Sequence, residues 1–517
     1  MYKKIMSLMC ATVMLLTVAG CAGDKQPANS DSGTPSKDDT TSDNNTSGGN
    51  SSVKDTVSYY DYDPNGNDGW LEVDNSSVTE NGSGVTTSKE FDLKSIKQLV
   101  FPKYNSSYTT TLGLRELQSV YKSKAKLSLN IVKDNAGTKD YELLVGRTSR
   151  TTTKKISDVS SYTISWKGNK LMIDGGSPKA INAAISVLAQ KVQNGEYILK
   201  KAIVGKCSDE SGKAGEYTES LTEDFVGNTL SSLWRRFSGS ETSVSFDGKA
   251  KTNIIIDTAN LCQVKDGKLY QKVTLNGTSK EGDVSVYNAS RPKLSTQDKF
   301  WFQYGYTEAS IKIAKGKGIG SAYWLHGKNA GLGSVYCEYD IVEIYGNSKY
   351  NQYSPLAWEV VENGDGVRNE SDWYLDTPTN TTKEYKIASA YHLDNFASLG
   401  EEYHTYGLEW DENYYRFTFD GEVIKTVKYT DMPEVYEAKN NFTKAEMINA
   451  YRQPVFAIFD MYCAAQTWPN SATYGIADVS GNNWVDDNIC AFDYLIVYQK
   501  AGQVNGKTYE EVKQKMK

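Results

Sequence analysis

The sequence predicts a multidomain chain in which a disordered tether and a small α/β domain precede an all-β sandwich. Its 517 residues exceed the length of one ordinary domain, so we expect two folded parts. Helical and strand patterns alternate up to about residue 206. From about residue 217, short strand patterns follow one another, separated by Gly, Asn and Asp turns. Such a succession of short strands and turns is typical of an antiparallel β-sandwich.

The first 20 residues have the features of a bacterial lipoprotein signal peptide. Lys3 and Lys4 precede a short apolar stretch, which ends in small residues directly before Cys21. The stretch is short for a membrane-spanning helix, and no later stretch is a better candidate. We therefore expect lipid on Cys21 to anchor the mature protein in the membrane. Plain secretion, with cleavage nearby, is the alternative.

Residues 21–58 form the predicted tether. After Cys21 they are mostly Ser, Thr, Asp, Asn, Gly and Lys, without an aromatic residue before Tyr59, so they cannot bury a core. As a flexible coil they span about 35 Å. A lipid anchor with such a tether resembles surface lipoproteins of Gram-positive bacteria. The resemblance implies a location on the extracellular face of the bacterial cell membrane.

Residues 59–206 form the predicted α/β domain. Helical patterns cover residues 114–123 and 178–192, and strand patterns lie between them, the first at residues 126–132. Pro178 suits the first turn of the second helix. Residues 141–150, Tyr-Glu-Leu-Leu-Val-Gly-Arg-Thr-Ser-Arg, together with the strands and helix after them, resemble the accessory N-terminal domain of family 20 hexosaminidases and family 67 glucuronidases. That domain is not catalytic, so we assign no chemistry to this part of the chain.

Residues 217–500 form the predicted sandwich, and one of its strands is unusually acidic. Residues 337–346 have an apolar, β-branched pattern yet include Glu338, Asp340 and Glu343, without Lys or Arg. Burying an ionised carboxylate without partners costs on the order of several kcal/mol, so this strand is more typical of a functional surface than of a core. A solvated acidic strand edge is the alternative.

The spacing of the three acids predicts a local irregularity. Regular alternation would turn Glu343 away from Glu338 and Asp340, whereas a β-bulge between Asp340 and Glu343 would bring all three onto one face. Two Glu and one Asp on one face suit acid/base and nucleophilic chemistry on a glycosidic bond.

The amino-acid composition limits which ligands and partners the protein is expected to bind. The formal net charge is −7 and no Lys/Arg-rich run stands out, so we expect no nucleic-acid partner. A polyanionic substrate is also disfavoured, although a local basic pocket could overrule the net charge. The five cysteines after Cys21 have neither a disulfide-framework pattern nor zinc-ligand spacing. The 36 Tyr and 10 Trp suit either sugar stacking or ordinary strand packing.

Five segments of residues 217–500 together resemble glycoside hydrolase family 16, whose members have a concanavalin-like jelly-roll sandwich with a long sugar-binding cleft. The acidic stretch 338–343 fits the family signature E-x-D-x-x-E. The other four segments, in the family's order, lie at residues 223–234, 304–325, 403–410 and 492–498. The resemblance implies that Glu338 is the nucleophile and Glu343 the general acid/base of a retaining glycosidase. Asp340 would hydrogen-bond the nucleophile, and catalysis would require no cofactor.

The same resemblance implies further contacts. Trp324 would stack on a sugar in the cleft, with a packed strand Trp as the alternative. Trp468 would also contact sugar, although Ala464-Ala465-Gln466 stand where the family often has glycines. Asp493 matches a position at which family members often bind a structural calcium. Residues 501–517 form a C-terminal tail that we expect to be helical or frayed.

Three further expectations concern the folding of the sandwich. Cys337, next to the acids, is expected to be a buried structural thiol, and His404 a hydrogen-bonded structural histidine in a strand. Residues 442–451 are expected to form a short helical insertion before a strand.

The bulged spacing also bears on the substrate, an extracellular polysaccharide. It resembles that of laminarinases, agarases, carrageenases and porphyranases, and the first expectation is an endo-β-1,3-glucanase acting by double displacement. A β-galactan hydrolase of the agar, carrageenan or porphyran type is the second. A non-catalytic surface glycan-binding lipoprotein is an alternative from another class, and transglycosylation would use the same residues.

Overall fold

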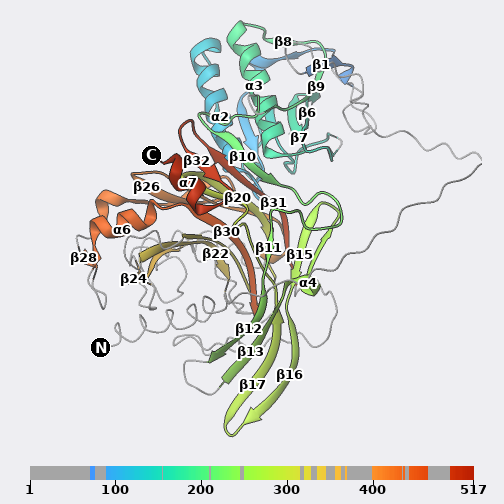
Figure 1. Cartoon of the computed structure of the whole chain (residues 1–517). Helices are drawn as coiled ribbons and strands as arrows, with labels where there is room; N and C mark the ends of the chain where they lie inside the picture. Colours follow the sequence, from blue (N-terminus) through green and yellow to red (C-terminus); the bar gives the residue numbers. More distant parts are fainter. Residues whose placement is uncertain are drawn as a thin grey trace, which may run out of the picture.

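The computed structural model (Figure 1) describes residues 70–75, 89–153, 155–208, 211–244, 250–314, 319–327, 335–344, 356–361, 367–368, 399–432, 435–436, 442–463 and 489–516. The predicted signal peptide and tether lie outside these residues. Within them, no helix combines the length and the apolar character needed to cross a membrane.

An α/β domain comes first, with a sheet in the order β1-β9-β6-β7-β5-β3-β4. Helices α2 (Tyr108–Val120) and α3 (Pro178–Asn194) bury apolar residues against one face of this sheet. Both predicted helices are present, and α3 begins at Pro178 as expected, with Ser177 as its N-cap. The strands of the sheet in this domain are β1 (Trp70–Val73), β3 (Gln98–Phe101), β4 (Asn130–Lys133), β5 (Glu142–Val145), β6 (Ser161–Lys167), β7 (Lys170–Gly175) and β9 (Ala202–Lys206).

Two boundaries in this domain differ from the prediction. Helix α2 begins six residues before residue 114, because the side chain of Ser107 accepts a hydrogen bond from the backbone of Thr109 and caps it there. The strand expected from residue 126 begins only at Asn130. A π-helical turn (Tyr121–Ala125) extends α2, and Lys126 ends it in the left-handed conformation at φ 60°.

The chain then forms the predicted β-sandwich. We call its first sheet the docked sheet, in the order β14-β15-β31-β20-β25-β26-β27, with β10 paired to β31. Its strands are β10 (Thr218–Glu223), β14 (Cys262–Lys265), β15 (Lys268–Lys272), β20 (Gly305–Lys312), β25 (His404–Trp410), β26 (Tyr414–Phe419), β27 (Glu422–Lys428) and β31 (Ile489–Gln499).

We call the second sheet the acidic sheet, in the order β11-β18-β30-β21-β22-β23-β24, with β19 joining β30 to β32 at one edge. Its strands are β11 (Arg235–Arg236), β18 (Lys293–Ser295), β19 (Trp301–Gln303), β21 (Ile319–Gly327), β22 (Val335–Ile344), β23 (Leu356–Val361), β24 (Val367–Arg368), β30 (Val455–Cys463) and β32 (Val504–Gly506). Helix α6 (Lys444–Tyr451) precedes β30, close to the helical insertion expected there.

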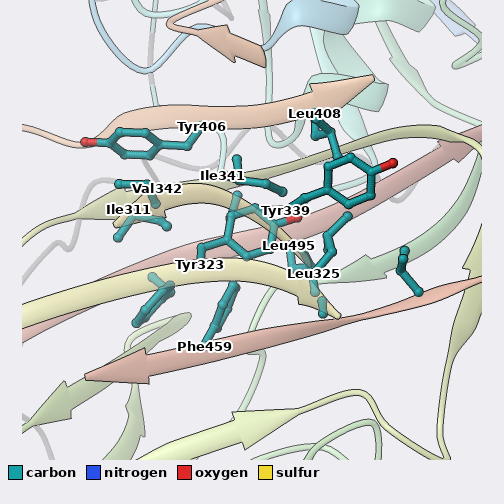
Figure 2. Packing of buried hydrophobic residues seen from close by; sticks show 14 of the residues in the cluster. Ile311, Tyr323, Leu325, Tyr339, Ile341, Val342, Tyr406, Leu408, Phe459 and Leu495 are labelled. Carbon is teal, nitrogen blue, oxygen red and sulfur yellow. The ribbon is translucent and has the colours of Figure 1, made fainter. Parts of the chain in front are cut away.

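The main hydrophobic core lies between these two sheets. Figure 2 shows residues of both sheets in it, among them Tyr323, Leu325, Tyr339, Phe459, Tyr406, Leu408 and Leu495. Cys337 is fully buried in the same core, as expected of a structural thiol. The predicted fold class, an all-β jelly-roll sandwich behind a small α/β domain, is therefore confirmed.

A four-stranded sheet in the order β12-β13-β17-β16 extends from the sandwich as an arm. Its strand β17 leads through Pro292 into β18, so that Arg291 and Lys293 fall on one face. The strands of the arm are β12 (Ser238–Val244), β13 (Ala250–Asp257), β16 (Thr274–Glu281) and β17 (Val284–Arg291).

The α/β domain packs on the outer face of the docked sheet. The backbone N–H of Tyr108, at the start of α2, donates to Glu308 of β20 at 3.0 Å. The Thr111 hydroxyl donates to the carbonyl of Gly421 at 2.8 Å. Tyr108 also joins Tyr306 and other residues of the docked sheet in a separate apolar cluster. The two folded parts therefore share a buried interface on the side of the sandwich opposite the acidic sheet.

Candidate active site

Strand β22 has the predicted bulge. In its pairing with β21, Asp340 lies opposite Trp324 and Val342 lies opposite Tyr323, so Ile341 is an extra residue without a partner in the register. Cross-strand partners point to the same side of a sheet. The cross-strand partners of the three acids are every second residue of β21 and therefore lie on one face. They are His326 for Glu338, Trp324 for Asp340 and Ala322 for Glu343. The bulge thus brings all three carboxylates onto one face.

This acidic face is the side of the sheet that points away from the sandwich core. Tyr339 and Val342, the neighbours of the acids along the strand, are fully buried in the core on the other side. Glu338 and Asp340 are themselves only 2% and 3% exposed, while Glu343 is half-buried. Along the strand, the first two carboxylates, those of Glu338 and Asp340, are therefore buried, and the third, that of Glu343, is more accessible.

Trp324 lies on the same face, cross-strand from Asp340, and is half-buried. The ammonium group of Lys293 lies 4.9 Å from the centre of its ring system, a cation–π arrangement. The indole also packs against an apolar cluster on the acidic face that includes Phe456 and Ile458 of β30. The structure thus brings Trp324 together with the three acids.

A buried group of charges flanks the acids, and the sequence prediction missed it. Arg291 forms ion pairs with Asp460 and, at 2.7 Å, with Glu241, and Lys293 lies 3.8 Å from Asp460. Burial lowers the pKa of Lys293, while the Asp460 carboxylate raises it, and Glu338 is among the charges that act on it. In this group the two cations, Arg291 and Lys293, are balanced by the carboxylates of Glu241 and Asp460. The sequence signal was present, because two cations spaced two apart in a strand share a face.

His326 is a second residue that the sequence prediction did not place in the site. It lies opposite Glu338 in the register and is half-buried. Burial, and to a lesser extent the charge of Lys293, lower its pKa to about 3. The imidazole is therefore neutral near pH 7 and adds an aromatic ring, not a charge, beside the acids. Its role depends on a cross-strand partner, which the local sequence does not reveal.

Two other predicted residues lie elsewhere. Asp493 is in β31 of the docked sheet, where it forms an ion pair with Lys268. In the described part of the chain, no group of three or more His, Cys, Asp or Glu side chains is placed to hold a metal ion. These surroundings fit an ion pair better than a calcium site, and calcium at Asp493 stays a prediction. His404, expected to be a hydrogen-bonded structural histidine, is buried in the docked sheet, with Nδ1 2.7 Å from Asp420 Oδ2.

Trp468 and Cys21 lie outside the described residues, as do residues 345–355 and 464–488. Sugar contact by Trp468 and lipidation of Cys21 therefore stay predictions.

Part of the chain is similar to known glycoside hydrolases. The family model "Glycosyl hydrolases family 16" matches residues 255–451, which include the three acids and Trp324. The chain is 23% identical over 213 residues to "Glucan endo-1,3-beta-glucosidase A1" of Niallia circulans, a match that covers 40% of this chain and 28% of that protein. It is 28% identical over 145 residues to "Beta-glucanase" of Fibrobacter succinogenes, covering 28% of this chain and 34% of that protein.

The chain thus spans about a third or less of the length of these two relatives. Among solved structures, the catalytic domain of a Thermotoga petrophila laminarinase is similar at 17% identity and a TM-score of 0.35, over 55% of this chain and 98% of that one. Residues 255–451 are therefore similar to glycosyl hydrolases of family 16.

Proposed function

We propose that this protein is a retaining, endo-acting β-glycanase that hydrolyses an extracellular polysaccharide, with a β-1,3-glucan as the first candidate. The observation that carries the proposal is the bulge at Ile341, because it brings Glu338, Asp340 and Glu343 onto one face beside Trp324. The names of the two relatives, a glucan endo-1,3-beta-glucosidase and a beta-glucanase, support a β-glucan.

In the proposed mechanism Glu338 is ionised and attacks the anomeric carbon of the sugar. Glu343 donates its proton to the glycosidic oxygen, and the departing sugar leaves a glycosyl ester on Glu338. Glu343 then takes a proton from water, whose oxygen attacks the anomeric carbon and releases Glu338. Retention requires carboxyl groups about 5–5.5 Å apart, which suits two acids on one face of one strand.

The environment of the three acids supports this division of roles. Neighbouring carboxylates raise one another's pKa, so one of them can hold a proton near pH 7. Glu343 is the more accessible acid and is suited to exchange protons with water. Buried Glu338 lies near the charge of Lys293, which favours its ionised form. Asp340, between them along the face, would hydrogen-bond the nucleophile.

One observation favours a second candidate. The cations Arg291 and Lys293 are buried on the acidic face, and Lys293 lies over the ring of Trp324. A cation at a sugar-stacking residue suits a galactan that carries an anionic ester, as carrageenan and porphyran do. A β-galactan hydrolase of the agar, carrageenan or porphyran type is therefore the alternative, and the cation favours its esterified substrates. A third possibility is a non-catalytic surface glycan-binding protein, which would bind a glycan on the same face without cleaving it.

The lipid anchor and the location belong to the proposal as well. Lys3, Lys4, the apolar stretch and Cys21 support lipidation, and residues 21–58 would hold the domains away from the outer face of the cell membrane.

The test is hydrolysis of a panel of laminarin, mixed-linkage glucan, agarose and carrageenan, by the parent and by Glu338→Gln. We expect the parent to release oligosaccharides from laminarin, and the variant to release about a thousandfold less or none. Release from carrageenan or agarose alone would move the substrate to a galactan. Binding without release by either protein would support the glycan-binding reading.

A further inference from the structure

The chain does not end with the last strand of the sandwich. After β31 it forms β32, which pairs with β19 at the edge of the acidic sheet, and then helix α7 (Tyr509–Lys515). Tyr509 and Val512 of this helix are buried in one apolar cluster with Trp301 of β19 and Phe456 of β30. The expected C-terminal tail is therefore a folded part of the acidic sheet.

The cluster lies on the acidic face, not on the core side. Phe456 is opposite His326 in the register, and Ile458 is opposite Trp324. Because cross-strand partners share a face, both belong to the face that carries the three acids. Helix α7 is thus packed beside the candidate active site.

Five rings connect the helix to the site, and we call them the aromatic buttress. The ring centres are 5.5 Å apart between Tyr509 and Trp301, and 4.6 Å between Trp301 and Phe456. They are 5.6 Å apart between Phe456 and His326, and again 5.6 Å between His326 and Trp324. Three of the four contacts are edge-to-face, the arrangement that aromatic pairs prefer at such distances. His326, neutral near pH 7, serves in this row as an uncharged ring.

The far end of the buttress is fixed in place. The Tyr509 hydroxyl donates to the side chain of Gln453 at 3.2 Å. The Thr508 side chain caps α7 by accepting from the N–H of Glu511 at 3.2 Å, and Lys515 donates to the carbonyl of Asn505 at 2.6 Å. A helix held at both ends can restrain the rings that pack against it.

We propose that α7 is a positioning element of the active site, and that Tyr509 acts through Trp301, Phe456 and His326 to hold the indole of Trp324 at the angle at which it stacks on a sugar. The inference rests on the proposed function, because it assigns α7 to the sugar-binding step of that reaction. Tyr509 is a positioning residue and does not touch the substrate. Removing its ring loosens Trp324 without displacing the carboxylates of β22.

The test compares Tyr509→Leu with Gln514→Ala, a change on the exposed side of the same helix. We expect Tyr509→Leu to raise KM for the cleaved polysaccharide about tenfold with kcat within about threefold of the parent, and Gln514→Ala to match the parent. An unchanged KM in Tyr509→Leu, accompanied only by a lower melting temperature, would reduce α7 to a stabilising element.

A second measurement needs no substrate. The fluorescence of Trp324 is taken as the difference between each protein and the same protein with Trp324→Phe, and acrylamide quenches it. We expect the quenching constant of this difference to rise about twofold in Tyr509→Leu and to stay unchanged in Gln514→Ala. If the parent cleaves none of the polysaccharides, the proposed hydrolysis fails, and the quenching alone then decides whether α7 holds the indole. Equal quenching in the parent and in Tyr509→Leu would overturn the inference.

Discussion

The two outer faces of the β-sandwich both carry buried carboxylates, and they differ in how these carboxylates are held. On the docked sheet, Glu308 accepts hydrogen bonds from the hydroxyls of Tyr306 and Tyr494 and from the backbone N–H of Tyr108. On the acidic sheet, the three acids follow one another along a single bulged strand, and the last of them is half-buried.

The same contrast holds for the second acid of the docked sheet. Glu409 accepts from the hydroxyls of Tyr217 at 2.7 Å and Tyr414 at 2.8 Å, and Arg416 lies 3.4 Å from it. Glu308 and Glu409 thus each accept hydrogen bonds from several donors, most of them on other segments of the chain. A carboxylate fixed in this way joins two parts of a fold. The proposed function instead assigns chemistry on a ligand to the acids on one face of β22, beside half-buried Trp324.

The largest difference between the two faces should appear in activity. We expect Glu343→Gln to lower kcat/KM about 10²- to 10⁴-fold, because the amide can neither donate nor accept the proton of the leaving oxygen. Glu308→Gln, the matched change on the docked sheet, should leave kcat/KM within about twofold of the parent. Initial rates on the polysaccharide that the parent cleaves measure both effects. Equal losses in the two variants would break the distinction between the faces.

The second difference should appear in stability. We expect Glu308→Ala to lower the free energy of unfolding by about 3 kcal/mol, because two phenol hydroxyls and the Tyr108 N–H lose their acceptor in a buried site. Glu422→Ala is the control, since Glu422 pairs with Lys133 of the α/β domain at 2.9 Å but is partly exposed. It should cost less than about 1 kcal/mol in the same urea titration. A control loss as large as that of Glu308→Ala would show that burial is not what matters at this interface.

The sequence could predict the bulge because the evidence for it is local. Glu338, Asp340 and Glu343 lie within six residues of one another, and the alternation of a strand makes their spacing informative without any knowledge of neighbours. The same holds for α3, whose Pro178 start and helical periodicity are read within one segment.

The docking of the α/β domain could not be predicted in this way. Glu308 also stands in an apolar strand pattern, and its partner Tyr108 is 200 residues away along the chain. His326 and Lys293 join the site only through the pairing of β21 and β30 with β22 and β18. Such neighbours are set by sheet order, which strand patterns leave undetermined. The spacing of three acids singles out Glu338 within its own strand, whereas only tertiary contacts show that Glu308 lies at an interface.

The smallest of the expected effects concerns pH. Burial raises the pKa of Glu308 to about 7, against the hydrogen bonds of its donors, which lower it. In the unfolded chain this carboxyl has a pKa of about 4.5, so the folded state binds the proton more tightly. Its contribution to stability is complete below about pH 4.5 and is lost as pH rises through about 7.

We therefore expect the free energy of unfolding of the parent to fall between pH 5 and 8 more steeply than that of Glu308→Gln, whose side chain is neutral throughout. Urea titrations of both proteins at each pH isolate this residue from the other groups of the interface, including His404 and Asp420. Parallel curves for the two proteins would mean that Glu308 is already ionised at pH 5 and that its donors outweigh its burial.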